Sequence, residues 1–258
     1  MTATIQTLTH FPIKGLSGHD LTEVVLCPNE GFPLDRMFGF IRPNSGFDPA
    51  NPAPLSKDNF HVLAGDARLA LLQTSFDQIS KTLTIANGND RSEFKLDTET
   101  GRTEAAKFLQ RYLGLSDVQT PTLISADPHR FTDVSVTSAQ MMNAISLVNQ
   151  ESVDAFAAQI GAPVEAARFR ANIVFTGLPA FSELDLVNRT ISIGDVQLRV
   201  LKRTQRCAAT EVNLVTAERD LKVPYLLRKH LGHMDMGIYA EVIAGGKIRS
   251  GDILKVTG

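Results

Sequence analysis

Short runs of β-branched and aromatic residues, separated by clusters of glycine, proline and asparagine, recur along most of this chain and constrain its fold most strongly. Such runs are typical of β-strands, and the residues between them are typical of turns. In the first part of the chain, the pattern predicts strands at residues 4–8, 21–26, 37–41, 60–63, 67–72 and 82–85.

Two connections in this part are also predicted. The sequence Asn87-Gly88-Asn89-Asp90 lies between apolar runs at 83–85 and 93–96 and indicates a hairpin. The proline-rich stretch 42–54 must be an irregular loop.

Helical periodicity is confined to a few segments. Residues 103–113 carry an apolar stripe that ends before Gly114, and further helices are predicted at 138–148, 152–160 and 217–231. Strand patterns return at 171–175, 190–193, 196–201, 239–243 and 252–256. Many short strands with several helices indicate a mainly β, α+β fold built from barrels or sandwiches. The Thr- and Pro-rich segment after residue 115 divides the chain into domains 1–115 and 116–258.

The composition excludes several classes of protein. The chain has 258 residues, 43% hydrophobic and 21% charged, with a net charge of −2, as in ordinary globular proteins. Without a basic surplus we expect no nucleic-acid partner and no attraction to an anionic membrane. No apolar run approaches the roughly 18 residues of a membrane helix, and the first residues resemble no signal peptide. We therefore expect a cytoplasmic protein.

Cysteine chemistry offers one candidate site. The two cysteines, Cys27 and Cys207, are too few for a disulfide framework or a four-thiolate cluster. Cys27 ends an apolar run, which predicts that it packs in the core. Cys207 follows Arg206, whose guanidinium favours the thiolate, the form of cysteine that binds metals. From this chemistry alone, Cys207 is a metal ligand, a nucleophile or a small buried side chain.

Five segments together resemble a known family. The segments are 10–15, 35–36, 168–174, 206–210 and 237–242. In order and spacing they are similar to a MOSC domain preceded by its N-terminal β-barrel domain. The family is named after the C-terminal domain of molybdenum cofactor sulfurase. The resemblance implies an N-terminal β-barrel-like domain followed by a MOSC β-barrel domain.

Within that family, the chain resembles the amidoxime-reducing molybdenum enzymes. This likeness implies that Cys207 is the catalytic metal ligand, bound to the molybdenum of a pterin cofactor. The phosphate of the pterin would be held by cationic and polar residues of both domains, namely Lys14, Arg36, Ser138, Arg168, Arg170, Asn172, Arg206 and Thr210. Guanidinium groups suit a phosphate monoester, which carries roughly 1.5 to 2 negative charges.

Some of these residues have simpler interpretations. Lys14 could be solvated, and Arg36 could only pair with Asp35. Arg168 and Arg170 alternate along one predicted strand and should face the same side, where Arg170 shares its face with Asn172. Thr210 could simply cap a turn.

The resemblance implies a molybdenum-dependent oxidoreductase that reduces small N-hydroxylated compounds. Because the chain has no cysteine cluster, its electrons would come from a separate flavin reductase, ferredoxin or haem protein. Pyridoxal phosphate is not expected, since the chain has no room for a desulfurase domain. Two alternatives remain open. One is a carrier or sulfur-transfer protein for molybdenum cofactor without substrate turnover, and the other is a barrel that binds neither cofactor nor substrate.

Overall fold

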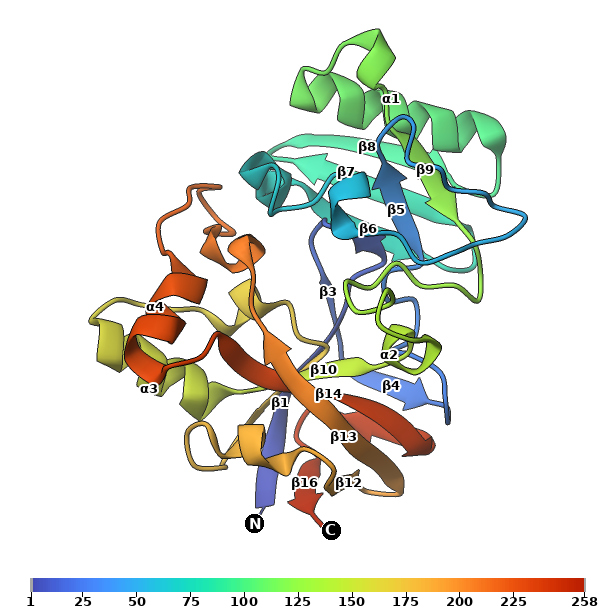
Figure 1. Ribbon diagram of the computed structural model, residues 1–258. Helices are drawn as coiled ribbons and strands as arrows, with labels where there is room; N and C mark the ends of the chain where they lie inside the picture. Colours follow the sequence, from blue (N-terminus) through green and yellow to red (C-terminus); the bar gives the residue numbers. More distant parts are fainter. Residues whose placement is uncertain (1, 258) are drawn as a thin grey trace.

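A closed β-barrel forms the base of the protein (Figure 1). The computed structural model describes residues 2–257. The main sheet runs in the order β11-β10-β14-β13-β12-β16-β1-β3, and pairing of β11 with β1 closes it into a barrel. Its strands are β1 (Thr2–His10), β3 (His19–Leu21), β10 (Ile145–Asn149), β11 (Ile173–Thr176), β12 (Thr190–Ile193), β13 (Val196–Gln205), β14 (Asp235–Ala244) and β16 (Ile253–Val256).

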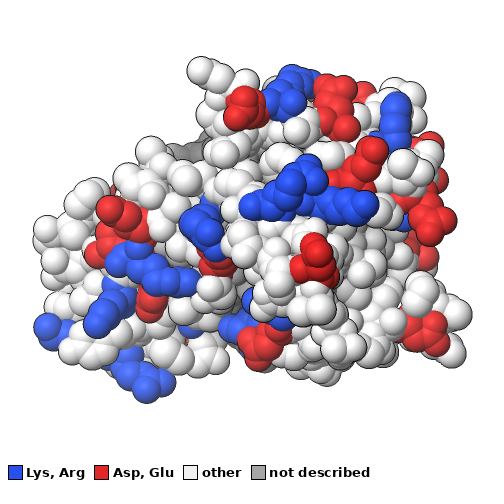
Figure 2. Space-filling view, turned by 90° about the horizontal axis from the view of Figure 1, so that it is seen from above, with Lys and Arg blue, Asp and Glu red and all other residues white. Residues whose placement is uncertain are grey.

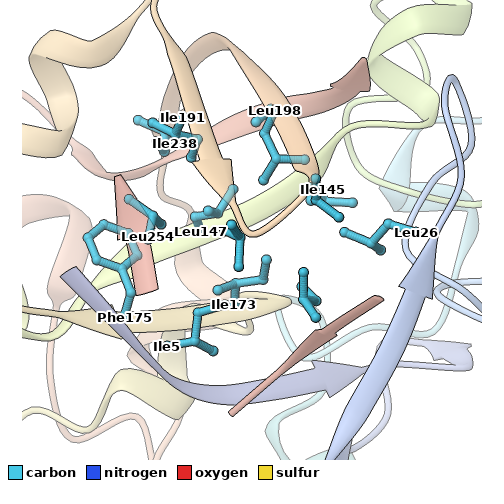
Figure 3. Close-up of a cluster of buried hydrophobic side chains, with 14 of the residues drawn as sticks. Ile5, Leu26, Ile145, Leu147, Ile173, Phe175, Ile191, Leu198, Ile238 and Leu254 are labelled. Atoms are coloured by element: carbon cyan, nitrogen blue, oxygen red, sulfur yellow. The ribbon is translucent and has the colours of Figure 1, made fainter. Parts of the chain in front are cut away.

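Alternating side chains fill the barrel interior. Along β13 the side chains of Val196, Leu198 and Val200 face the barrel interior, because alternate residues of a strand point to the same side. They pack against apolar residues from every other barrel strand, and Figure 3 shows Ile5, Leu147, Ile173, Ile191, Ile238 and Leu254 converging on one core. Burial of each such side chain contributes about 1.5–3 kcal/mol, so this core fixes the strand register.

The same alternation is visible residue by residue on β13. Val196, Leu198 and Val200 are fully buried, whereas Gln197 and Arg199 between them are exposed. This period of two places one set of side chains in the core and leaves the other outside the barrel.

One barrel strand differs from the others in being buried along its whole length. β10 is buried at every position and pairs in parallel with β11 and antiparallel with β14. The helix predicted at 138–148 is therefore wrong: only α2 (Ala139–Met142) is helical, and the chain then enters β10. A short apolar run bounded by turns fits a buried strand as well as a helix, and pairing on both edges decides for the strand.

Helices cover this part of the barrel. α3 (Gln150–Ile160) and α4 (Val223–Leu231) contact one another and share an apolar cluster that includes Val153, Phe156 and Leu227. α4 starts six residues later than the predicted helix at 217–231, because Pro224 occupies its first turn and Ala217 has a positive φ of 59°.

The N-terminal half forms a second apolar core above the barrel (Figure 1). α1 (Glu99–Leu113) lies against the sheet β6-β7-β8, and Gly114 ends it in a left-handed conformation, as predicted. The strands here are β2 (Ile13–Lys14), β5 (Phe38–Ile41), β9 (Thr122–Ser125), β6 (Gln73–Asp77), β7 (Thr82–Asn87) and β8 (Asp90–Lys95), with β4 (Glu23–Leu26) and β15 (Gly246–Arg249) paired separately.

Most of the predicted elements of this half are present. The hairpin at 87–90 joins β7 to β8, and residues 42–54 form no helix or strand. Two predicted strands are wrong: 67–72 forms the 3-10 helix η2 (Ala67–Leu71), where Asp66 caps the backbone N–H of Arg68, and 60–63 contributes only a bridge from Phe60 to Ile41.

The remaining short 3-10 helices lie in connections. They are η1 (Lys57–Asn59), η3 (Asp117–Gln119), η4 (Ala166–Phe169), η5 (Ser182–Leu186) and η6 (Ala208–Glu211). The predicted α+β class, a β-rich N-terminal part followed by a β-barrel, is confirmed. Within residues 2–257, none of the helices has the length and apolar character needed to cross a bilayer.

Candidate functional site

A cleft of about 270 Å³ lies where the N-terminal half meets the barrel. Its walls combine residues of β2 and its neighbours with residues of β10, β13 and β14, so segments far apart in sequence meet there. All the predicted site residues except Ser138 line it: Lys14, Arg36, Arg168, Arg170, Asn172, Arg206, Cys207 and Thr210. The structure thus brings the predicted set together around one thiol.

Cys207 sits at the point where β13 has ended and η6 begins. Its side chain is half-buried, and its sulfur is a free thiol. The carbonyl oxygen of Cys207 accepts hydrogen bonds from the backbone N–H and the Oγ1 of Thr210, at 3.0 and 2.9 Å. Thr210 therefore holds the turn that presents the thiol to the cleft, which matches the simpler interpretation of this residue.

Arg206 is buried beside Cys207 and is held by the backbone. Its Nε donates to Met236 O at 2.8 Å, and its Nη1 donates to Phe169 O at 2.8 Å. Burial lowers the pKa of Arg206 to about 10, while the neighbouring Tyr239 and Cys207 act in the opposite direction. The guanidinium still carries its charge at neutral pH, so it provides a fixed positive potential next to the thiol.

Two arginines from different halves of the chain lie over one aromatic ring. The guanidinium carbons of Arg36 and Arg170 are each 4.4 Å from the centroid of the Phe11 ring, and Arg36 Nη2 donates to Arg170 O at 3.1 Å. Both residues have a positive φ, 49° for Arg36 and 51° for Arg170. Left-handed backbone at residues with side chains is costly and is concentrated at functional sites.

These two arginines differ in their hydrogen bonds. Arg36 is ion-paired with Asp35, as its simpler interpretation proposed. The guanidinium of Arg170 donates no hydrogen bond to any residue in 2–257, although burial and the nearby Arg36 lower its pKa to about 9. A half-buried arginine whose donors are unused by the described residues is available to an anionic ligand.

Lys14 is buried and not solvated. Its ammonium group donates to Phe131 O at 2.8 Å and forms an ion pair with the half-exposed Asp133. Burial lowers the pKa of Lys14, and the Asp133 carboxylate acts against that effect. Burial would raise the pKa of Asp133, but Lys14 and Arg36 together lower it. The charged pair therefore bridges β2 and the loop that follows β9.

Arg168 and Asn172 are engaged with the protein itself. Arg168 donates to both carboxylate oxygens of Asp220, at 2.6 and 2.8 Å, and to Glu165 at 2.6 Å. The amide oxygen of Asn172 accepts from the N–H and the hydroxyl of Ser146. The prediction that Arg168 and Arg170 alternate along one strand is wrong, because η4 includes Arg168 and Arg170 follows it in a left-handed turn.

Two other residues lie elsewhere than the sequence suggested. Ser138 is outside the cleft lining, because its hydroxyl caps α2 by accepting a hydrogen bond from Met141 N at 3.1 Å. The prediction that Cys27 packs in the core is wrong: this residue is exposed just after β4, where the apolar alternation ends at Leu26.

Sequence reasoning did not single out several residues of the cleft. Asp133, Ser146, Lys202, Thr204 and Tyr239 also line it. Tyr239 lies in the segment 237–242 that carried the resemblance, so a signal for it was present. Asp133 lies in an irregular loop, where no periodicity could have indicated it. Thr204 is buried, and its hydroxyl has no partner in the described chain.

Cationic side chains predominate in the cleft but not over the molecule. The lining includes Lys14, Arg36, Lys57, Arg168, Arg170, Lys202 and Arg206 against the carboxylates of Asp35 and Asp133. Figure 2, in contrast, shows Lys and Arg interspersed with Asp and Glu over the face seen from above. Over residues 2–257, no group of three or more His, Cys, Asp or Glu side chains is placed to hold a metal ion.

The protein is a β-barrel capped by a second β-rich part, and a cationic cleft around one thiol lies between the two. This arrangement defines its class. The chain belongs to the MOSC family: residues 128–255 match the MOSC domain, and residues 2–127 match the MOSC N-terminal beta barrel domain. The resemblance recognised in the sequence is confirmed.

Known relatives include two insect proteins. The chain is 30% identical over 166 residues to molybdenum cofactor sulfurase of Drosophila persimilis and 29% identical to that of Drosophila pseudoobscura pseudoobscura. Each match covers 60% of this chain and 20% of the relative, so the chain spans about a fifth of the length of these sulfurases.

Two solved structures are also similar to this chain. The YUAD protein from Bacillus subtilis matches 98% of this chain and 94% of its own, with 16% identity and a TM-score of 0.45. YiiM from Geobacillus stearothermophilus matches 44% of this chain and 54% of its own, with 22% identity and a TM-score of 0.35.

Proposed function

We propose that this protein binds molybdenum cofactor in the cleft and reduces small N-hydroxylated compounds, with Cys207 as the protein ligand of the metal. The observation that carries the proposal is that one cleft contains both the Cys207 thiol and the half-buried guanidinium of Arg170, which donates no hydrogen bond within residues 2–257. The thiol suits a soft metal, and the guanidinium suits the phosphate of the organic carrier.

The residues present fit such a group in three respects. Cys207 supplies a soft donor, and the absence of a complete ligand cluster in residues 2–257 agrees with a metal whose other ligands come from its carrier. Arg170 has unused donors for a phosphate, and the buried hydroxyl of Thr204 lacks a partner. The cleft also shares Leu63 and Arg170 with a second cavity of about 320 Å³, which gives room for a ligand larger than phosphate.

Each residue would contribute one function. Arg170 would bind the phosphate directly, while Arg36 and Lys14, already paired with carboxylates, would add positive potential. Arg206 would place a fixed positive charge beside Cys207. When bound, the cofactor supplies a two-electron redox centre for cleaving an N–O bond, and the protein supplies binding, orientation and electrostatics. The electrons would come from a separate donor protein.

A carrier or sulfur-transfer function is the second candidate. The relatives named above are molybdenum cofactor sulfurases, and a carrier would use the same cleft and the same thiol without turning over a substrate. The two functions differ only in whether the loaded protein reacts with an N-hydroxylated compound.

An assay on loaded protein separates these functions. Protein made in a host that synthesises molybdenum cofactor is mixed with benzamidoxime and reduced methyl viologen, an artificial electron donor. The proposal predicts that benzamidine forms catalytically. Molybdenum-loaded protein that forms no benzamidine or other amine, but delivers cofactor to a cofactor-free acceptor enzyme, would instead establish the carrier function.

A further inference from the structure

Tyr239 is a cleft residue to which no role has yet been given. It belongs to β14, between Ile238 and Ala240, which are both fully buried in the barrel core. Because successive side chains of a strand point to opposite faces, Tyr239 points out of the barrel. Its ring lines the same cleft as Cys207.

The strand register supports this orientation. Tyr239 pairs with Ser146 on β10 and with Lys202 on β13, and both of these partners also line the cleft. Directly paired residues on neighbouring strands place their side chains on the same face of the sheet. Three adjacent strands thus present Ser146, Tyr239 and Lys202 to the cleft as one row.

We infer that Tyr239 is the proton donor to the leaving oxygen during N–O bond reduction, an inference that rests on the proposed function. Its phenol forms no hydrogen bond with another residue in the part of the chain that the structure describes, so the proton is available to a ligand. After burial, the groups that influence the pKa of Tyr239 most are Arg206, Asp133, Arg36 and Cys207.

The other acids of the cleft are less suited to this step. Asp133 is paired with Lys14, and its lowered pKa keeps it ionised and without a proton at neutral pH. Lys14 donates to protein acceptors, and the side chain of Lys202 is exposed to solvent. Burial raises the pKa of Tyr239, so its phenol retains a proton at neutral pH. A phenol is nevertheless a far stronger acid than water, and Arg206 stabilises the phenolate that remains.

The reaction balances with this assignment. A hydroxylamine R–NH–OH takes up two electrons and two protons and yields R–NH2 and water. The N–O bond breaks and an N–H bond forms, and the electrons come from the reduced electron-transfer protein. Tyr239 Oη supplies one proton to the oxygen that leaves as water, solvent supplies the other to nitrogen, and solvent then reprotonates the phenolate.

The Tyr239→Phe variant removes this proton and keeps the ring. We expect the molybdenum content to be unchanged and KM to stay within about threefold of wild type. We expect kcat to be at least about 100-fold lower, because general acid catalysis contributes about 10²–10⁴-fold. Tyr225→Phe, at an exposed position of α4, is the matched control and should have wild-type kcat.

A second readout does not need the cofactor. The chain has 3 tyrosines and no tryptophan, so alkaline titration of near-ultraviolet absorbance reports the phenols alone. A transition displaced to high pH should disappear in Tyr239→Phe if burial holds this proton, and it should remain in Tyr225→Phe.

The outcomes separate the inference from the proposed function. If Tyr239→Phe is loaded with molybdenum and as active as wild type, Tyr239 is not the donor, while the proposed function stands. If loaded wild-type protein reduces no N-hydroxylated compound, both are overturned. Fluorotyrosine incorporation lowers the phenol pKa and should shift the alkaline limb of the kcat profile to lower pH; an unshifted limb also contradicts the inference.

Discussion

The carboxylate of Asp133 is ion-paired with the ammonium group of Lys14, and it lies within a cleft whose other charged groups are mostly cationic. Asp133 therefore acts as an internal counter-ion for Lys14, Arg36 and Lys57. A bound anion must compete with it, which makes Asp133 a determinant of the affinity of this cleft for anions.

Replacing Asp133 by Asn should strengthen anion binding. A unit charge about 5 Å from a ligand contributes a few kcal/mol at an effective dielectric constant of about 20, part of which is lost to rearrangement of Lys14. We expect inorganic phosphate to bind about tenfold more tightly to Asp133→Asn in calorimetric titrations. Asp97→Asn, the same change at an exposed position outside the cleft, should leave affinity unchanged. Weaker binding to Asp133→Asn would show that the carboxylate positions Lys14 for the ligand.

Arg170 should be the main direct contact with the anion. Its donors are unused by residues 2–257, and hydrogen bonds to charged groups contribute about 1.5–3 kcal/mol. Arg170→Gln should thus weaken phosphate binding at least about tenfold, whereas Arg91→Gln, at an exposed ion pair on β8, should not change it. Equal binding by Arg170→Gln and wild type would remove Arg170 from the anion site.

Arg168 should matter for stability instead. Asp220→Asn breaks the two-pronged contact with a buried guanidinium, and we expect about 2 kcal/mol less free energy of unfolding in urea. The matched control is Asp185→Asn, which breaks the exposed pair with Arg203 and should cost less than about 1 kcal/mol. Similar losses in both variants would contradict a structural role for Arg168.

The stability of the protein should depend on His61 in weakly acidic solution. Burial, assisted by Arg42 and opposed by Asp66, lowers the pKa of His61 from 6.5 to about 4. Between these values the unfolded chain binds more protons than the folded protein, so the free energy of unfolding falls as pH decreases from about 6.5 to about 4. His61→Gln should reduce this slope in urea titrations across that interval. A slope unchanged by the substitution would mean that His61 is protonated in the folded protein.

The sequence predicted elements with clear periodicity and failed where tertiary pairing decides the structure. The strand at 190–193 agrees with β12, and Gly114 ends α1, because both depend on local signals. Residues 145–148 belong to the predicted helix 138–148 but form most of β10, since a short apolar run carries no period of its own. The division predicted between residues 115 and 116 stays a prediction; the family matches meet between 127 and 128.

The same distinction applies to the site. The family resemblance predicts that Lys14, Arg170 and Cys207 belong to one cofactor site. All three line the cleft in the structure. The sequence could not separate Arg170, which has unused donors, from Arg168, which is paired with Asp220, because the partner lies about fifty residues away along the chain. Which arginine is available for a ligand follows from three-dimensional contacts alone.

Metal analysis of the cysteine variants tests the central claim most directly. Wild type, Cys207→Ser and Cys27→Ser are purified from a host that makes molybdenum cofactor, and molybdenum per chain is measured by mass spectrometry. We predict that wild type and Cys27→Ser retain the metal and that Cys207→Ser loses most of it. Full molybdenum content in Cys207→Ser, or loss of the metal only in Cys27→Ser, would contradict the assignment of Cys207 as the ligand.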